Sequence, residues 1–294
     1  MKIFSILVVK DEADIIQYSI EKALAWSDYI FIVENMSTDG TWELISKLYY
    51  NHPKIKIWGR YGGEFTETIR QIAFNQFESM LQYGDWICRL DADEEYIDDP
   101  KIFLSQLPTK CDHVNNISFH YYFTEKDYEN EINTGDTSWH EGKLKHYHAH
   151  HSEIRFIKYC NYTYWQQNRG WPHTLLHPAE IAIRLKHYQY RNISQIKRRL
   201  QIRIQESSND YFAHEKADRR IMYKKLFNYD PTDFELKNLI VPSHFLLLDT
   251  GEYKMYKNTI PSPPLKSRIF MRIRSSIYNI IFKKLNIYTG KTIS

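Results

Sequence analysis

The chain has 294 residues, enough for one large domain or for one domain with a substantial appendage. Hydrophobic residues make up 43% and charged residues 26%, which excludes a disordered or a fibrous chain. The formal net charge of +3 is unevenly distributed, because residues 265–294 hold seven Lys or Arg and no acid. The preceding residues carry 32 basic and 36 acidic side chains, so the basic excess belongs to the tail alone.

Three widely spaced cysteines, Cys88, Cys111 and Cys160, form no C-x-x-C pair. This usage predicts neither a disulfide framework nor a cysteine zinc site, and it fits a reducing compartment best. The apolar run that opens the sequence is too short for a signal peptide, and no stretch approaches the ~20 apolar residues of a membrane span. We therefore expect a cytoplasmic protein, with any membrane contact at the inner face.

Strand and helix patterns alternate through the first hundred residues. Apolar runs predict buried strands over 3–9, 29–33, 54–58 and 86–90, and helical spacing predicts helices around 15–24, 42–49 and 65–81. Further strands are expected over 117–123 and 154–157. Alternating strands and helices predict an α/β fold whose sheet has helices on both faces.

Polar clusters follow three of these strands, at Lys10–Asp11–Glu12, at 34–40 and at 91–95. In open α/β sheets, ligands bind beyond the carboxyl ends of the strands. Three clusters converging on one edge are hard to explain by solubility. The sequence therefore predicts a binding site there.

Asp91 and Asp93 form a D-x-D pair directly after the fourth strand. Two carboxylates one residue apart can reach a single Mg²⁺ or Mn²⁺, both of which prefer hard oxygen ligands. Such an ion would neutralise the charge that grows on a departing diphosphate. A solvated acidic turn is the alternative, but the position after a buried strand favours the metal.

The segments VVKDEADII at 8–16, VENMSTDGT at 33–41 and DWICRLDADE at 85–94 resemble family 2 glycosyltransferases of the GT-A fold. The corresponding family patterns are roughly N-E-x-D-I-I, D-N-x-S-T-D-G-T and W-x-x-x-L-D-A-D-E. Asp11 stands where Asn is usual and Glu34 where Asp is usual. The resemblance covers the first third of the chain strongly and the remainder loosely. It implies a GT-A mixed sheet with a C-terminal helical extension.

The resemblance further implies which residues contact a nucleotide-sugar donor. Ser37 and Thr38 could equally well cap the following helix, and Asp39 could hold either the base or its own loop. Arg70 could face the donor phosphates or be an exposed helix charge. The donor-binding candidates are Val9, Asp11, Glu12, Glu34, Asn35, Ser37, Asp39, Arg70, Asp91 and Ala92.

Histidine is the expected third metal ligand, beside Asp91 and Asp93. His187 lies in a segment, HYQYR, that resembles one following the catalytic core in some related enzymes, where a late histidine can complete the metal shell. A hydrogen-bonded histidine in the sheet is the alternative. Three more histidines alternate and would share one face of a strand, where acceptor contact or a surface position is favoured over structural zinc: His146, His148 and His150.

An inverting transferase needs a carboxylate to take the proton of the acceptor hydroxyl, whereas a retaining one does not, and the sequence leaves the stereochemistry open. None of the later acids lies in a diagnostic motif. The acids considered as base are Asp136, Glu141, Glu153 and Glu180. The catalytic candidates taken forward are Asp93, Glu153 and Glu180.

We expect a catalytic domain over 1–192, with a donor half to about residue 100 and an acceptor half after it. A polar stretch over 125–145 is suited to a mobile loop above the site. A helical extension would cover 193–264. The basic amphipathic tail, 265–294, fits either a membrane surface or packing on the core.

The sequence thus predicts a hexosyltransferase that uses Mn²⁺ or Mg²⁺ to move a sugar from a nucleoside-diphosphate donor. Among such donors, a UDP-sugar is favoured. The acceptor would be a saccharide or a lipid-linked saccharide, and no nucleic-acid module is present. Two alternatives are a sugar nucleotidyltransferase, which would need a Gly-rich loop where Lys10–Asp11–Glu12 stands, and a non-catalytic binding protein on the same scaffold.

Overall fold

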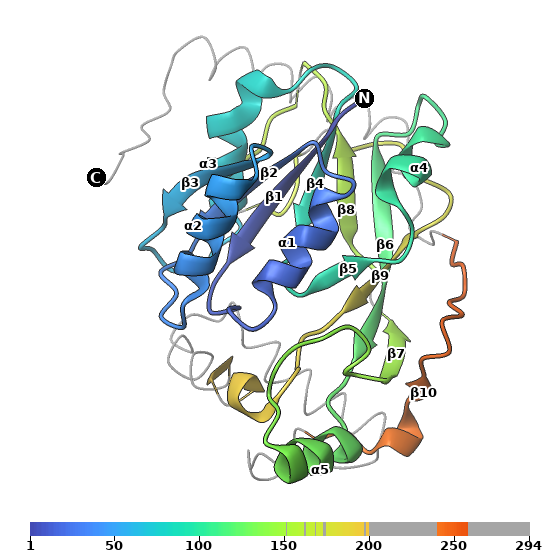
Figure 1. Cartoon of the computed structure of the whole chain (residues 1–294). Coiled ribbons are helices and arrows are strands. Elements are labelled where there is room, and N and C mark those ends of the chain that lie inside the picture. The colour runs from blue at the N-terminus through green and yellow to red at the C-terminus, as the bar shows by residue number, and fades with distance from the viewer. Residues whose placement is uncertain are drawn as a thin grey trace. The chain divides into compact units, whose positions relative to one another are not determined.

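The computed structural model of the chain describes residues 1–150, 152–161, 163–167, 169–172, 175–196, 198–199 and 240–257 (Figure 1). The chain forms two compact units that interleave along the sequence. The first unit comprises Met1–Ile117, His151–Leu185 and the chain from Met255, and the second comprises Ser118–His150 and Lys186–Lys254. These units do not follow the boundaries near residues 100 and 192 that the sequence suggested.

The sheet of the first unit has the strand order β3-β2-β1-β4-β8-β6. Its four parallel strands are β1 (Ile3–Val9), β2 (Tyr29–Glu34), β3 (Ile55–Arg60) and β4 (Trp86–Leu90). The antiparallel strand β8 (Ile154–Lys158) follows β4, and it pairs in turn with the first residues of β6 (His113–Tyr121). The short strands β5 (Glu94–Tyr96) and β9 (Ile183–His187) pair with each other, and β9 also pairs with β6.

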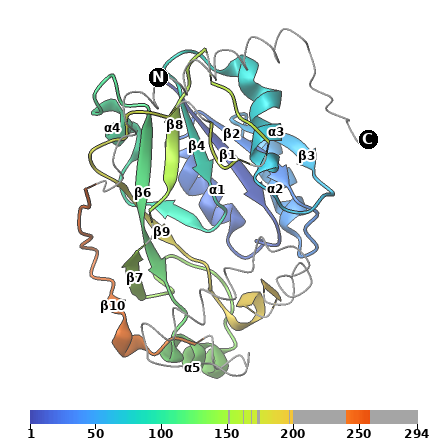
Figure 2. The ribbon, with the colours of Figure 1, turned by 180° about the vertical axis from the view of Figure 1, so that it is seen from behind.

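Helices cover both faces of this sheet, as the two opposite views show (Figures 1 and 2). One face carries α1 (Ile16–Leu24), α2 (Thr41–Asn51) and α4 (Pro100–Ser105). The other face carries α3 (Thr68–Phe77), which continues into the 3-10 turn η1 (Glu78–Met80). The mixed α/β fold with a mostly parallel sheet confirms the fold class expected from the sequence.

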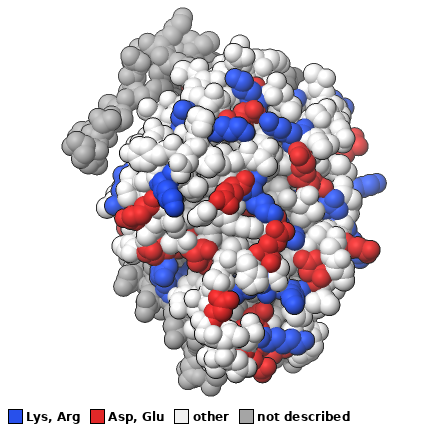
Figure 3. Space-filling model, viewed as in Figure 1, with Lys and Arg blue, Asp and Glu red and all other residues white. Residues whose placement is uncertain are grey.

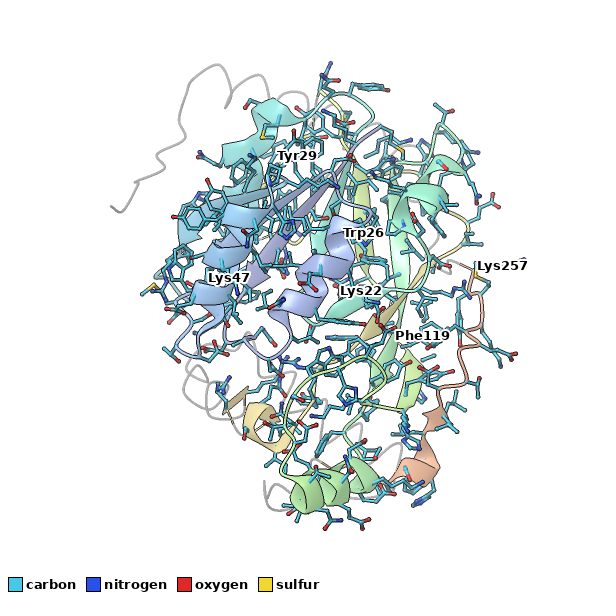
Figure 4. All side chains as sticks on the ribbon, viewed as in Figure 1. Lys22, Trp26, Tyr29, Lys47, Phe119 and Lys257 are labelled. Carbon is cyan, nitrogen blue, oxygen red and sulfur yellow. The ribbon has the colours of Figure 1, made fainter. Side chains whose placement is uncertain are left out.

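The pleat of β1 explains why this strand is apolar along its whole length. All seven of its residues are buried, and successive side chains point to opposite faces. Ile3 and Leu7 pack under α1 and α2, whereas Phe4 and Ile6 pack under α3. Trp26, just beyond the end of α1, closes the first of these layers against Tyr96 and Phe156 (Figure 4).

The second unit is built on antiparallel pairing. The last residues of β6 pair with β7 (His146–His150), and β7 pairs with β10 (Leu247–Leu248). Between β6 and β7 lies α5 (Glu125–Thr134), which begins with a capping box formed by Thr124 and Asp127. The expected mobile loop over 125–145 is therefore wrong for its first half, because the cap and the acids of the first turn stabilise a helix there.

Only part of the helical extension expected over 193–264 lies among the described residues. Residues 240–257 contain the 3-10 turn η5 (Ser243–Phe245) and β10 instead of a long helix. Most of the extension and the whole tail over 265–294 lie outside the described residues. Within the described part of the chain, no helix is long and apolar enough to cross a membrane. Acidic and basic side chains are interspersed on the face shown in Figure 3.

Candidate functional site

The carboxyl ends of β1, β2 and β4 lie together at one edge of the first unit's sheet. In the parallel register Val9 is opposite Glu34, and Leu7 is opposite Leu90. The polar clusters that follow these strands therefore begin at neighbouring points of the same edge. This arrangement is the one predicted from the sequence, and it is the position at which open α/β sheets bind ligands.

The loops after β1 and β2 are joined by side chains of the first two motifs. The backbone N–H of Asp11 donates to Ser37 Oγ at 2.9 Å, and the backbone N–H of Thr38 donates to Asp11 Oδ1 at 2.7 Å. The two loops thus satisfy each other's buried polar groups. Ser37 and Asp11 serve first to fix the shape of this edge.

Asp39 holds the same junction from the other side. Its carboxylate accepts from the backbone N–H of Ala13 at 3.0 Å and from that of Thr41 at 3.1 Å, while the backbone N–H of Glu12 donates to Thr41 Oγ1 at 2.9 Å. The N-cap of α2 is Gly40, whose φ of 98° suits glycine, and it makes no side-chain capping bond. A capping role for Ser37 and Thr38 is therefore wrong.

Two residues at this edge have unusual backbone angles. Asp11 follows β1 and Met36 follows β2, and both have φ near 53°. Asp tolerates the left-handed region, but an exposed Met gains nothing there that would offset its cost of about 1–2 kcal/mol. Backbone outliers of this kind concentrate at functional sites, where the loop shape matters more than local stability.

Glu34 and Asn35 are buried at the end of β2. Glu34 accepts from the backbone N–H of Ser37 and, at 2.7 Å, from Arg60 Nε. The Asn35 amide donates to the backbone oxygens of Tyr61 and Gly63, and its Oδ1 has no hydrogen-bond partner among the described residues. Both side chains tie the end of β3 to the site edge.

The first carboxylate of the D-x-D pair is held by two arginines. Asp91 Oδ1 accepts from Arg70 on α3, and Asp91 Oδ2 accepts from Arg155 on β8 at 2.8 Å. Both arginine side chains are only 2% exposed, whereas the Asp91 side chain is 24% exposed. Arg70 is thus neither an exposed helix charge nor a surface group, and it reaches Asp91 from beneath.

These contacts belong to a closed ring of six alternating charges, all in the first unit. Glu67 contacts Arg70 at 3.2 Å and Arg89 at 3.4 Å, and Glu153 contacts Arg89 at 3.3 Å and Arg155 at 2.6 Å. Arg155 also pairs with the buried Glu94 outside the ring. In order, the ring runs through Glu67, Arg70, Asp91, Arg155, Glu153 and Arg89.

The ring sets the charge of Asp91. Burial alone would raise the pKa of Asp91, but the guanidinium groups of Arg155, Arg70 and Arg89 outweigh it and hold this pKa well below its usual range. The pKa of Arg155 is raised well above its usual value, because the attraction of Glu94, Asp91 and Glu153 exceeds the effect of burial. Asp91 is therefore an ionised carboxylate of fixed position.

The remaining catalytic candidates fall in different places. Asp93 is buried after β4, and Glu153 contacts guanidinium groups with both oxygens, which makes it a weaker candidate for the acceptor base. Glu180 is exposed two residues after Pro178, which bridges to His113 at the start of β6. Since β4 and β6 are both antiparallel to β8, that start lies at the edge opposite Asp91. The role of Glu180 stays a prediction from the sequence.

The histidines belong to the second unit. His187, at the end of β9, has its ring 4.6 Å from that of His120, and His120 is opposite His148 in the β6–β7 register. His146 and His148 share a strand face, as their alternation predicted. Among the described residues, no group of three His, Cys, Asp or Glu side chains could hold a metal ion.

The other donor-binding candidates frame the same edge. Val9 and Glu12 are buried where β1 ends, and Ala92 is buried between the two aspartates. Glu67, Arg89 and Arg155 had no site role among the predictions from the sequence. A signal existed for the two arginines, since each is a lone guanidinium inside a short apolar strand and such a charge must be paired there.

The D-x-D pair fits a divalent cation in one respect. Each Asp91 oxygen uses one lone pair for a guanidinium and retains another, and the side chain reaches solvent. Mg²⁺ is commonly bound by one or two carboxylates together with substrate phosphates, without a complete protein cage. Asp91 alone meets that minimum.

No protein-family model matches the chain, and no curated protein matches it in sequence. Among solved structures, the chain is similar to the mannosyltransferase PcManGT from Pyrobaculum calidifontis in complex with GDP-Man and Mn²⁺, with a TM-score of 0.33 and 13% identity over 53% of this chain and 44% of that one. It is also similar to S. aureus TarS 1-349, with a TM-score of 0.28 and 19% identity over 42% of this chain and 36% of that one.

A second S. aureus TarS structure gives a TM-score of 0.29 and 14% identity, over 42% of this chain and 22% of that one. The chain thus spans less than half the length of each of these proteins. Likenesses of this size carry no argument about activity. The function must be argued from the residues of the chain itself.

Proposed function

We propose that this chain is a glycosyltransferase that moves a sugar from a nucleoside-diphosphate donor to a hydroxyl acceptor. The observation that carries the proposal is the convergence of three motif segments at one sheet edge, in the registers Val9–Glu34 and Leu7–Leu90. The resemblance to family 2 glycosyltransferases was carried by those same segments. An ionised carboxylate at a loop edge fixed by hydrogen bonds suits a divalent cation, which can in turn bind the diphosphate of such a donor.

Residues in two parts of the edge would have different roles in donor binding. The loops after β1 and β2 would shape the nucleoside pocket, because Asp11, Ser37 and Asp39 fix their backbone. Asp91 and Asp93 would hold Mn²⁺ or Mg²⁺, which would neutralise charge on the departing diphosphate. Among the catalytic candidates we assign the reacting sugar to Asp93, which follows β4, because both oxygens of Glu153 contact guanidinium groups.

Calorimetric titration of UDP- and GDP-sugars, with and without Mn²⁺, tests this proposal. We expect binding of at least one donor, tightened by Mn²⁺ and weakened by Asp93→Asn. Glu43→Gln, which alters an exposed carboxylate on α2, is the matched control and should bind like the wild type. A wild-type chain that binds none of the donors would favour the non-catalytic alternative. When pyrophosphate is added, its consumption with formation of a nucleoside triphosphate and a sugar 1-phosphate from the donor would indicate a nucleotidyltransferase.

A lipid-linked acceptor is proposed from the tail over 265–294, where seven basic residues and no acid accompany apolar side chains. Basic amphipathic segments bind anionic membrane surfaces. Cosedimentation with anionic vesicles should therefore retain the full chain and release a chain that ends at Pro264. Equal retention of both would remove the tail from the proposal.

A further inference from the structure

The charge ring around Asp91 buries ionised groups where apolar side chains would pack at a lower cost in free energy. Six ionised side chains meet there, and two of them, Arg70 and Arg155, are almost fully buried. Removing charges from water costs several kcal/mol for each ion, and apolar residues of similar volume often replace buried ion pairs without loss of stability. Stability alone therefore gives a weak reason for this arrangement.

The ring is also assembled from distant parts of the first unit. Glu67 and Arg70 come from the start of α3, Arg89 and Asp91 from the end of β4, and Arg155 with Glu153 from the start of β8. Gly170 lies over it, since a Cβ at this position would be 3.7 Å from both Arg89 Nη1 and Glu67 Oε2. A long connection that follows β8 thus packs against the ring.

Only one member of the ring belongs to the D-x-D pair. The ring gives each Asp91 oxygen its own guanidinium partner, which leaves the carboxylate one orientation. Arg89 touches neither Asp91 oxygen, but it joins the two acids that hold Arg70 and Arg155 in place. Groups that orient a metal or substrate ligand in this way often matter as much as the ligand itself.

We infer that Arg89, with Glu67, is a positioning residue for donor binding, acting on Asp91 through Arg70 and Arg155. This inference rests on the proposed function and adds to it two residues to which no site role was assigned from the sequence. Neither side chain needs to touch the donor. Opening the ring at Arg89 would leave Asp91 charged and paired, but it would loosen Glu67 and Glu153, the two acids that hold Arg70 and Arg155 in place.

The test compares Arg89→Gln and Glu67→Gln with Arg184→Gln. Arg184 pairs with Asp98 at 2.6 Å, with exposed fractions of 20% and 15%, close to those of Arg89 and Glu67. Arg184 lies on β9 and Asp98 follows β5, and neither strand contributes a residue to the ring. We expect both ring variants to weaken the Mn²⁺-dependent donor affinity by about tenfold. Arg184→Gln should leave it unchanged, and urea denaturation identifies any variant that has lost its fold.

Nitrogen NMR of the arginine side chains provides the second readout. In the wild type, the guanidinium groups of Arg70 and Arg155 should give separate signals for hindered rotation, which Arg89→Gln averages and Arg184→Gln preserves. If the wild type binds no donor, the proposed function fails and this spectrum alone decides whether the ring fixes Asp91. Unchanged signals together with a donor affinity equal to that of Arg184→Gln would overturn the inference.

Discussion

The two halves of the site edge are stabilised by different kinds of interaction. The loops after β1 and β2 are held by hydrogen bonds between side chains and backbone, such as those of Ser37 and Asp39. The end of β4 is held by ionised groups, in which Asp91 has two arginine partners from other elements. One ligand-binding edge thus combines a hydrogen-bonded loop frame with a charge network. The loop frame should respond to loss of a hydroxyl, and the charge network to loss of a charge or to acid.

The largest expected effect comes from removing the carboxylate at the centre of the ring. Asp91→Ala leaves Arg70 and Arg155 with one fewer counter-charge, and breaking a buried pair from one side costs about 3 kcal/mol. Urea denaturation should show this loss, while Glu43→Gln stays within about 0.5 kcal/mol of the wild type. A loss no larger than that of Glu43→Gln would mean that the ring does not stabilise the fold.

The contribution of the ring to the unfolding free energy should also depend on pH, because the ring lowers the pKa of Asp91. Because this pKa is depressed in the folded protein, the stabilising contribution is present above the ordinary value near 4 and is lost as the pH falls through the lower folded value. The difference in unfolding free energy between the wild type and Asp91→Asn should therefore persist from pH 7 to pH 5 and shrink only in stronger acid. A difference already shrinking between pH 7 and pH 5 would contradict the depressed pKa.

The loop edge should respond to loss of a single hydroxyl. Ser37→Ala removes the acceptor for the buried backbone N–H of Asp11, and leaving such a group unsatisfied costs about 1–3 kcal/mol. Ser105→Ala, which removes an exposed hydroxyl at the end of α4, is the matched control and should have little effect. In contrast to Asp91→Asn, the effect of Ser37→Ala should not vary with pH down to pH 3.

The smallest effect concerns the backbone. Met36→Gly relieves the left-handed conformation and should raise the unfolding free energy by about 0.5–1 kcal/mol, since part of the relief is offset by the flexibility of glycine. Met36→Ala retains a Cβ and should bring no gain. Equal stability of the two variants would show that the conformation of Met36 carries no strain.

Local patterns predicted the strands and loops of this edge, but not the side-chain partners of Asp91. Apolar runs located β1 and β4 at their observed bounds. The turn residues after β2 marked the loop, and the bond from the backbone N–H of Thr41 to Asp39 is local in the sequence. The partners of Asp91 were less accessible, because Arg155 lies 64 residues away along the chain.

The environment of Arg70 could not be predicted from the pattern of its own helix alone. The sequence placed it on the right helix and suggested that it faces the site, but the helical pattern alone could not choose between solvent and Asp91. Similarly, the acids of the region 125–134 indicated a polar loop, and the capping box that makes it a helix was overlooked.

The central claim is that the D-x-D edge binds an activated sugar for transfer, and release of nucleoside diphosphate from the donor measures it most directly. We expect Mn²⁺-dependent release by the wild type, a loss of at least about a hundredfold in Asp93→Asn, and normal rates in Glu43→Gln. Release that is equally fast in Asp93→Asn, or absent from the wild type with every UDP- and GDP-sugar tried, would contradict the account.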